Sequence, residues 1–211
     1  LILLYSCSND NQNNKNTDED YKSIKLVFTG DIMTHPSLVN AFKDNDVLID
    51  LKDYFQGDMV FANLEFAVNT NKPPMPYPEF NGSLDYLQYF FNYFNTFSIA
   101  NNHAYDQGAQ AEAETVSELH KNNKLTLGGS TNSTSIAPII TNINDIALFI
   151  SAYTMLDNGI SHKTNKNGHF YFMNFYPKKE DLIEKVKSDL ALATNNEIKI
   201  ISLHFGLEYT T

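Results

Sequence analysis

Residues 98–108 have the sequence Ser-Ile-Ala-Asn-Asn-His-Ala-Tyr-Asp-Gln-Gly, in which a short apolar run ends abruptly in polar side chains. Amides, an imidazole and a carboxylate are groups that bind divalent metals or transfer protons. The candidates in this stretch are Asn101, Asn102, His103 and Asp106. A strand-like run followed by ligand-type residues recurs at three other places, and together the four predict an active site: Gly30-Asp31, Asn63-Leu64-Glu65, and His204 with Glu208.

The apolar runs that precede these motifs predict an α/β fold. Residues 24–29, 59–62, 96–100, 125–127 and 198–203 have the character of buried strands, and amphipathic helical patterns lie between most of them. This alternation is typical of a mostly parallel α/β sheet flanked by helices. In such sheets the ligand crevice lies beyond the carboxyl ends of the strands, so we expect the polar motifs to converge there.

Other local patterns fill in the connections. Helices are predicted after Pro36, from the N-cap Ser83, over residues 109–122 and over residues 182–190. Residues 136–143 and 146–153 are expected to form a hairpin. The four prolines between residues 70 and 82 favour an extended loop. The pair Gly128-Gly129 predicts a turn and is weak evidence for a phosphate-binding loop, because no GxGxxG or GxxxxGK pattern surrounds it.

Composition excludes some functions. With 211 residues and 42% hydrophobic residues, the chain can form one large globular domain. The net charge of -10 and a pI near 4.9 argue against a general binder of nucleic acid or anionic membranes, which needs a basic face. A substrate that carries phosphates or carboxylates would therefore need help from a metal.

The N-terminal residues indicate an anchor. The single cysteine, Cys7, follows a short apolar run and Ser6, and this stretch resembles a bacterial lipobox. We therefore expect residues 1–7 to be the remnant of a lipoprotein signal peptide, residues 8–22 a disordered polar tether, and residues 23–211 the folded domain, truncated at both ends. The predicted location is extracytoplasmic, with the protein anchored to a bacterial membrane by lipid on Cys7. The alternative is a free thiol in a frayed end; one cysteine excludes a thiolate zinc site or a disulfide framework.

The polar motifs suit a metal site. Carboxylate and amide oxygens with neutral imidazole favour Mn, Fe or Zn, and a bridging carboxylate could hold two ions that share a water molecule. Each residue also has a structural alternative: Asp31 as a helix cap, Asn63 as a partner of loop backbone, Glu65 as a solvated charge, His103 as a hydrogen-bonded structural histidine and Asp106 as a turn residue. Their joint position at strand ends favours the metal site.

The four motifs resemble successive motifs of the CapA family, also called PgsA, of bacterial capsule and poly-γ-glutamate synthesis proteins. Order and spacing match from about Ile24 to Tyr209, and the stretches are residues 30–33, 58–65, 98–108 and 202–209. The resemblance implies a calcineurin-like metallophosphoesterase fold, a layered α/β sandwich of mostly parallel sheets flanked by helices.

The resemblance also implies roles for the residues. Asp31 would be a first metal ligand, Glu65 with Asn63 would occupy the bridging region, and Asn102 and His204 would be further ligands. His103 would donate a proton or orient a phosphate, with Asn101 and Asp106 in support, and Glu208 would support His204 as a second candidate catalytic residue. Two features depart from typical metallophosphoesterases: Asp31-Ile32-Met33 replaces Asp-x-His, with His35 further along, and Asn63-Leu64-Glu65 replaces Gly-Asp. The expected final Gly-His-x-His motif would lie beyond Thr211.

Three functions are consistent with these features. The first is a membrane-anchored CapA-type protein that acts on an anionic polymer such as poly-γ-glutamate, or on a phosphate-bearing substrate, through a divalent-metal hydrolase-like site. The second is a noncatalytic polymer-binding or assembly subunit of a capsule export complex. The third is a generic extracytoplasmic metallophosphoesterase. The expected partners are an anionic polymer or a phosphate-bearing substrate, the membrane through the lipid on Cys7, and subunits of a capsule synthesis complex; no nucleic acid is expected.

Overall fold

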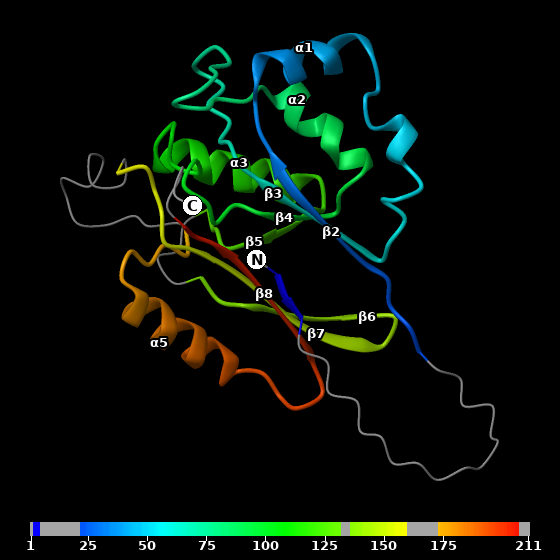
Figure 1. The fold of residues 1–211 in the computed structure, drawn as a ribbon, viewed down its shortest axis with the longest axis vertical. Helices are drawn as coiled ribbons and strands as arrows, with labels where there is room; N and C mark the ends of the chain where they lie inside the picture. Colours follow the sequence, from blue (N-terminus) through cyan, green and yellow to red (C-terminus); the bar gives the residue numbers. More distant parts are fainter. Residues whose placement is uncertain (1, 5–21, 132–135, 160–172, 207–211) are drawn as a thin grey trace.

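The computed structural model describes residues 2–4, 22–131, 136–159 and 173–206, and Figure 1 shows their arrangement. The predicted lipidation site Cys7 and the candidate Glu208 lie outside the described residues. No helix in these described ranges is long and apolar enough to cross a membrane.

The first sheet has four parallel strands in the order β2-β3-β4-β5. The strands are β2 (Leu26–Ile32), β3 (Met59–Leu64), β4 (Thr96–Ser98) and β5 (Leu125–Leu127). Every residue of β3 is buried, as expected for a central strand covered on both faces. Because the strands are parallel, their carboxyl ends lie along one edge of the sheet. The predicted parallel α/β arrangement is confirmed.

The second sheet has the order β1-β8-β7-β6. Its strands are β1 (Ile2–Leu4), β8 (Ile198–His204), β7 (Ile146–Thr154) and β6 (Ile139–Ile143). Strands β7 and β8 are parallel, whereas β1 and β6 are antiparallel to their neighbours. The predicted hairpin is β6–β7, and both residues of its turn, Asn144 and Asp145, have positive φ angles, as a two-residue type I′ turn requires.

The two sheets pack face to face through an apolar core. Met59, Phe61 and Leu127 of the first sheet contribute to the same buried cluster as Leu148 and Ile150 of the second. This core fixes the two sheets relative to each other, so that the end of β8 lies near the ends of the first sheet's strands.

Helices cover the outer faces of both sheets (Figure 1). The first sheet is covered by α1 (Pro36–Asp44), α2 (Leu84–Tyr89) and α3 (Ala109–Lys121), with the short 3-10 turns η1 (Ile49–Leu51) and η2 (Phe90–Asn92) beside them. The second sheet is covered by α5 (Lys179–Leu190). The predicted N-cap of α2 is confirmed, because Ser83 accepts a hydrogen bond from the Tyr86 backbone. The layers of helix, sheet, sheet and helix are those of a metallophosphoesterase-like α/β sandwich.

Strand β2 is longer than predicted and contains a bulge. Phe28 lies opposite Phe61 of β3, but Asp31 lies opposite Asn63, so β2 uses one more residue than β3 over this stretch. Asp31 is therefore inside the strand and does not cap the following helix. His35 is the N-cap residue of α1, and it makes no side-chain capping bond.

The pair Gly128-Gly129 has a packing role. Gly128 has a φ angle of +77°, and a Cβ atom there would lie 2.6 Å from the Cβ of Ala100 and 2.9 Å from the carbonyl oxygen of Ala152. A Cβ atom on Gly129 would lie 1.8 Å from the Cδ1 of Ile99. The end of β5 therefore approaches β4 and β7 too closely for any side chain, which explains the pair without a bound phosphate.

A carboxyl group is buried beneath this turn. Glu112 of α3 is 1% exposed, and its Oε1 would lie 2.8 Å from a Cβ atom placed on Gly129. Burial raises the pKa of Glu112 well above its ordinary value, and a backbone hydrogen bond from Ser130 opposes this shift. The folded protein therefore favours the protonated carboxyl.

We predict that Glu112→Gln removes a component of the protein's pH-dependent stability. In the unfolded chain this carboxyl has its ordinary pKa of about 4.5, whereas in the folded protein it ionises at higher pH, so the folded state holds its proton longer. This contribution to stability is complete below the unfolded pKa and is lost as the pH rises through the folded pKa. Each tenfold difference in proton affinity between the two states corresponds to about 1.4 kcal/mol of folding free energy.

The measurement is urea denaturation from about pH 4 to about pH 9. We expect the glutamine variant to gain stability relative to the wild type as the pH rises. Glu114→Gln, on a less buried side of the same helix, is the control and should show no such trend. Parallel stability curves for Glu112→Gln and the wild type would contradict the prediction.

Candidate functional site

The candidate residues meet at the carboxyl ends of β2, β3, β4 and β8, as the sequence predicts. A cavity of about 760 Å³ opens there. Its wall combines apolar side chains with a few polar groups, which is typical of sites for small molecules. The lining residues with an acid, amide or imidazole side chain are His35, Glu65, Asn102, His103, Asp157, Asn158 and His204.

Three residues form a candidate metal-binding cluster. One ligand atom from each of Asp31, Glu65 and His204 lies within 4.8 Å of the other two. Glu65 is buried, and its Oε1 lies 4.0 Å from Nε2 of both His103 and His204. Two carboxylates and an imidazole suit Mn, Fe or Zn. The fold thus brings together donors from β2, the end of β3 and the end of β8.

The fully buried Asn101 is held by backbone groups at both ends of its amide. Its Nδ2 donates to the carbonyl oxygen of Leu64 at 2.8 Å, and its Oδ1 accepts from the backbone N–H of His103 at 3.1 Å. A carbonyl can only accept and an N–H can only donate, so the amide has one orientation. Asn101 therefore acts as a fixed reference between the end of β3 and the loop after β4.

The orientation of Asn101 determines that of Asn63. The Nδ2 of Asn101 also donates to the Oδ1 of Asn63 at 3.1 Å. The Nδ2 of Asn63 consequently faces the acids and donates to Asp31 at 2.9 Å and to Glu65 at 3.2 Å. An amide nitrogen that donates protons is not a metal ligand. In this arrangement Asn63 links the two carboxylates, and its predicted role as a ligand stays a prediction.

His103 is oriented by Asp106. The Nδ1 of His103 lies 2.6 Å from the Oδ2 of Asp106, which also accepts from the backbone N–H of Phe80 at 2.7 Å. Because the carboxylate accepts, the ring carries its proton on Nδ1 and directs Nε2 toward Glu65. Asp106 therefore orients His103, whereas its alternative role from the sequence was that of a turn residue.

Asn102 contacts the imidazole of His204. The Oδ1 of Asn102 lies 2.7 Å from the Nε2 of His204, so both predicted ligands point to the same place. Burial lowers the pKa of His204, while the charge of Asp31 opposes this shift and that of His103 adds to it. A lowered pKa favours neutral imidazole, the form that binds metals.

The sequence did not single out Asn158. This residue follows β7, and its side chain contacts Asn102, His103 and Asp106. Its φ angle is +53° and that of Gly159 is +69°. The Asn-Gly pair is a recognised signal for such positive φ angles, and it could have indicated an ordered turn here. His35 of the cavity wall was noted in the sequence only as a departure from the Asp-x-His motif.

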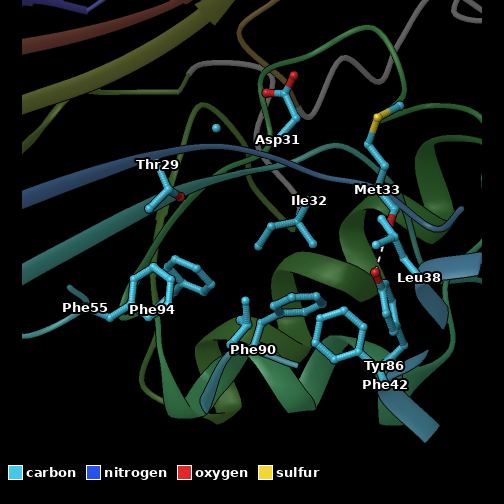
Figure 2. Close-up of a pocket in the computed structure, with 12 residues that line it drawn as sticks. Thr29, Asp31, Ile32, Met33, Leu38, Phe42, Phe55, Tyr86, Phe90 and Phe94 are labelled. Atoms are coloured by element: carbon cyan, nitrogen blue, oxygen red, sulfur yellow. Dashed lines mark hydrogen bonds between the residues drawn. The ribbon is translucent and has the colours of Figure 1, made fainter. Parts of the chain in front are cut away.

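A second, apolar pocket lies behind Asp31 (Figure 2). It has a volume of about 270 Å³, and Phe42, Phe90 and Phe94 contribute to its wall. Figure 2 shows the carboxylate of Asp31 pointing away from these rings, and Met33 lines both this pocket and the larger cavity. Asp31 thus separates an apolar interior from the polar cluster.

We predict that Asn101→Asp strongly destabilises the fold. A carboxylate at this buried position cannot donate to the Leu64 carbonyl or to Asn63, and it would leave a charge without compensation. We expect the free energy of unfolding to fall by about 3–5 kcal/mol, measured by chemical denaturation. Asn102→Asp is the matched control, since Asn102 is only half-buried, and should cost much less. Equal losses in the two variants would contradict the assigned role of Asn101.

Comparison with known protein families gives a match over most of the chain. The family model described as bacterial capsule synthesis protein PGA_cap matches residues 25–211, which include the four motifs and the described candidate residues. Among curated proteins, no significant match is found. The match covers most of the chain and confirms the resemblance to the CapA family. The chain therefore belongs to the PGA_cap family of bacterial capsule synthesis proteins.

Proposed function

We propose that the protein is a CapA-type capsule or poly-γ-glutamate synthesis protein with a divalent-metal hydrolase-like site, anchored outside the cytoplasm by lipid on Cys7. The observation that carries the catalytic part is the cluster of Asp31, Glu65 and His204, of which Glu65 and His204 line a large cavity. Family membership supports the role in capsule synthesis. The lipobox-like sequence before Cys7 supports the anchor.

The residues present fit a metal ion. Asp31 and Glu65 offer carboxylate oxygens, and His204 offers an imidazole that burial keeps neutral. The Oδ1 of Asn102, beside His204, is a fourth donor atom. These residues would hold an Mn, Fe or Zn ion, which when bound would polarise a substrate oxygen and acidify a water molecule. The family resemblance adds a second ion to the proposal, and Glu65 would help to hold it.

His103 would serve as the proton donor. Asp106 holds the proton on Nδ1, so Nε2 is the atom that receives or releases a proton toward the cavity. The buried Asp106 also stabilises the imidazolium that forms when Nε2 is protonated. The His103–Asp106 pair would thus supply a proton to a leaving group beside the carboxylates of Asp31 and Glu65.

The charge of the site favours an anionic substrate only when a metal is bound. The chain has a net charge of -10, and Asp31 and Glu65 would repel a phosphate or a polyglutamate carboxylate. A bound divalent cation reverses this local effect. The proposed partner is therefore an anionic polymer or a phosphate-bearing substrate, together with other subunits of a capsule synthesis complex.

One observation favours a noncatalytic role instead. The Nε2 of His204 already contacts the Oδ1 of Asn102, and the amide of Asn63 donates to both Asp31 and Glu65, so each residue of the metal cluster has a partner within the protein. A site that is satisfied in this way supports a second candidate function, a polymer-binding or assembly subunit of a capsule export complex. Metal binding and turnover distinguish the two candidates.

We predict that Asp31→Asn lowers the affinity for Mn²⁺ by about tenfold or more, because a charged ligand is lost. Isothermal titration calorimetry of the full-length, lipid-free protein measures the dissociation constant. Asp50→Asn, an exposed position in η1, changes the net charge equally and should leave the constant unchanged. No Mn²⁺ binding by the wild type, or equal binding by Asp31→Asn, would contradict the metal site.

We predict that His103→Gln lowers hydrolysis of an aryl phosphate by about 10²- to 10⁴-fold, the usual contribution of a general acid. Its Mn²⁺ affinity should stay near that of the wild type, because His103 is outside the metal cluster. Steady-state kinetics with Mn²⁺ test this.

Loss of polymer production in cells carrying Asp31→Ala or His103→Ala would connect the site to capsule synthesis. Unchanged production in both, with no bound metal, would favour the assembly subunit.

A further inference from the structure

Asn158 lies between the His103–Asp106 pair and the Asn102–His204 pair. Its Oδ1 accepts a hydrogen bond from the Nδ2 of Asn102 at 3.0 Å. Its Nδ2 lies 3.4 Å from the Oδ1 of Asp106 and 3.2 Å from the Nδ1 of His103. A single amide thus contacts both halves of the candidate site.

The hydrogen-bond capacity of Asp106 orients Asn158. His103 donates its Nδ1 proton to Asp106, whose Oδ2 is the closer partner at 2.6 Å. The Nδ1 atom therefore has no lone pair that could accept a hydrogen bond from Asn158. The ionised carboxylate only accepts hydrogen bonds, and the amide nitrogen of Asn158 therefore faces it. The opposite orientation would place the Asn158 oxygen against the Asp106 carboxylate.

The orientation of Asn158 in turn determines that of Asn102. Because the oxygen of Asn158 faces Asn102, the Asn102 nitrogen must face Asn158. The Oδ1 of Asn102 is then left toward His204, 2.7 Å from its Nε2. Reversal of Asn102 would present an amide nitrogen, which cannot bind a cation, to the metal cluster.

The backbone around Asn158 holds it in this place. Its positive φ angle of 53° is one that asparagine adopts more readily than most residues. The next backbone N–H, that of Gly159, donates to the Oδ1 of Asp157 at 2.9 Å and closes a local turn. The amide is thus presented from a defined turn at the end of β7.

We propose that Asn158 is a positioning residue that fixes the amide of Asn102 with its oxygen toward His204 and the candidate metal site. This inference rests on the proposed function in so far as the oxygen serves a metal. The orientation itself is a property of the metal-free protein, so the two can be tested separately.

The first test uses the metal-free protein and NMR of the Asn102 side-chain amide. In the wild type we expect its protons to be protected from solvent exchange and to show a nuclear Overhauser contact to Asn158. In Asn158→Ala we expect exchange to accelerate by about tenfold or more as the hydrogen bond is lost. Asn123→Ala, which removes another asparagine of positive φ from the surface, is the control. Unchanged protection of Asn102 in Asn158→Ala would overturn the proposal.

The second test is a double-mutant cycle on Mn²⁺ affinity. Loss of a residue that orients a ligand usually weakens metal binding about 10- to 100-fold, and we expect this range for Asn158→Ala. In an Asn102→Asp background both ends of residue 102 are oxygens, so orientation no longer matters, and Asn158→Ala should then change the dissociation constant less than about threefold. A merely structural role would give the same loss in both backgrounds, which would overturn the proposal.

The two tests separate the outcomes. If the wild type binds no Mn²⁺, the proposed function fails, and the amide exchange still decides whether Asn158 orients Asn102. If the wild type binds Mn²⁺ and Asn158→Ala binds it equally well, the metal site stands and the positioning role fails.

Discussion

The single orientation of the Asn101 amide is the constraint from which the rest of the site follows. Its two ends contact a backbone carbonyl after β3 and a backbone N–H after β4, and neither group can exchange donor for acceptor. The second proton of the Asn101 amide is donated to Asn63, so the Oδ1 of Asn63 faces Asn101. The Nδ2 of Asn63 then faces the carboxylates of Asp31 and Glu65 and donates to both. The backbone positions of β3 and β4 thereby influence where the side chains of Asp31 and Glu65 lie. Full burial of Asn101 makes this strict, since water cannot replace a lost partner.

Strand register does the same for Asp31. Side chains alternate between the two faces of a sheet, so a change of one residue moves a side chain to the other face. The extra residue in β2 places Asp31 opposite Asn63, where the Asn63 amide reaches it. On the opposite face, Ile32 belongs to the buried apolar cluster beneath the helices that cover the first sheet. Adjacent residues of one short segment thus supply an exposed carboxylate to the site and an apolar side chain to the core, and the bulge sets the register in which Asp31 meets Asn63.

Much of this arrangement could be predicted from the sequence because it depends on local patterns. Apolar runs that end in ligand-type residues located the strand ends, and parallel topology implied that these ends converge. The amide orientations could not be predicted, since the partners of Asn101 and Asn63 come from other strands. The bulge in β2 was missed because its apolar pattern simply stops at Gly30. Asn158 was missed because its contacts with Asn102 and Asp106 span more than 50 residues of chain.

The hydrogen bonds that the site makes in the metal-free protein determine which contacts must break when a metal binds. The His204 Nε2 that would ligate an ion contacts the oxygen of Asn102, so this hydrogen bond must be exchanged for coordination and the ring proton must move to Nδ1 or leave. The lowered pKa of His204 reduces competition from a second proton, which favours the metal. The donations from Asn63 to Asp31 and Glu65 can persist, because each carboxylate has further lone pairs. Internal hydrogen bonds and coordination are thus compatible at the acids and compete only at His204. Whether the site binds a metal or stays a hydrogen-bonded polar cluster therefore depends on His204.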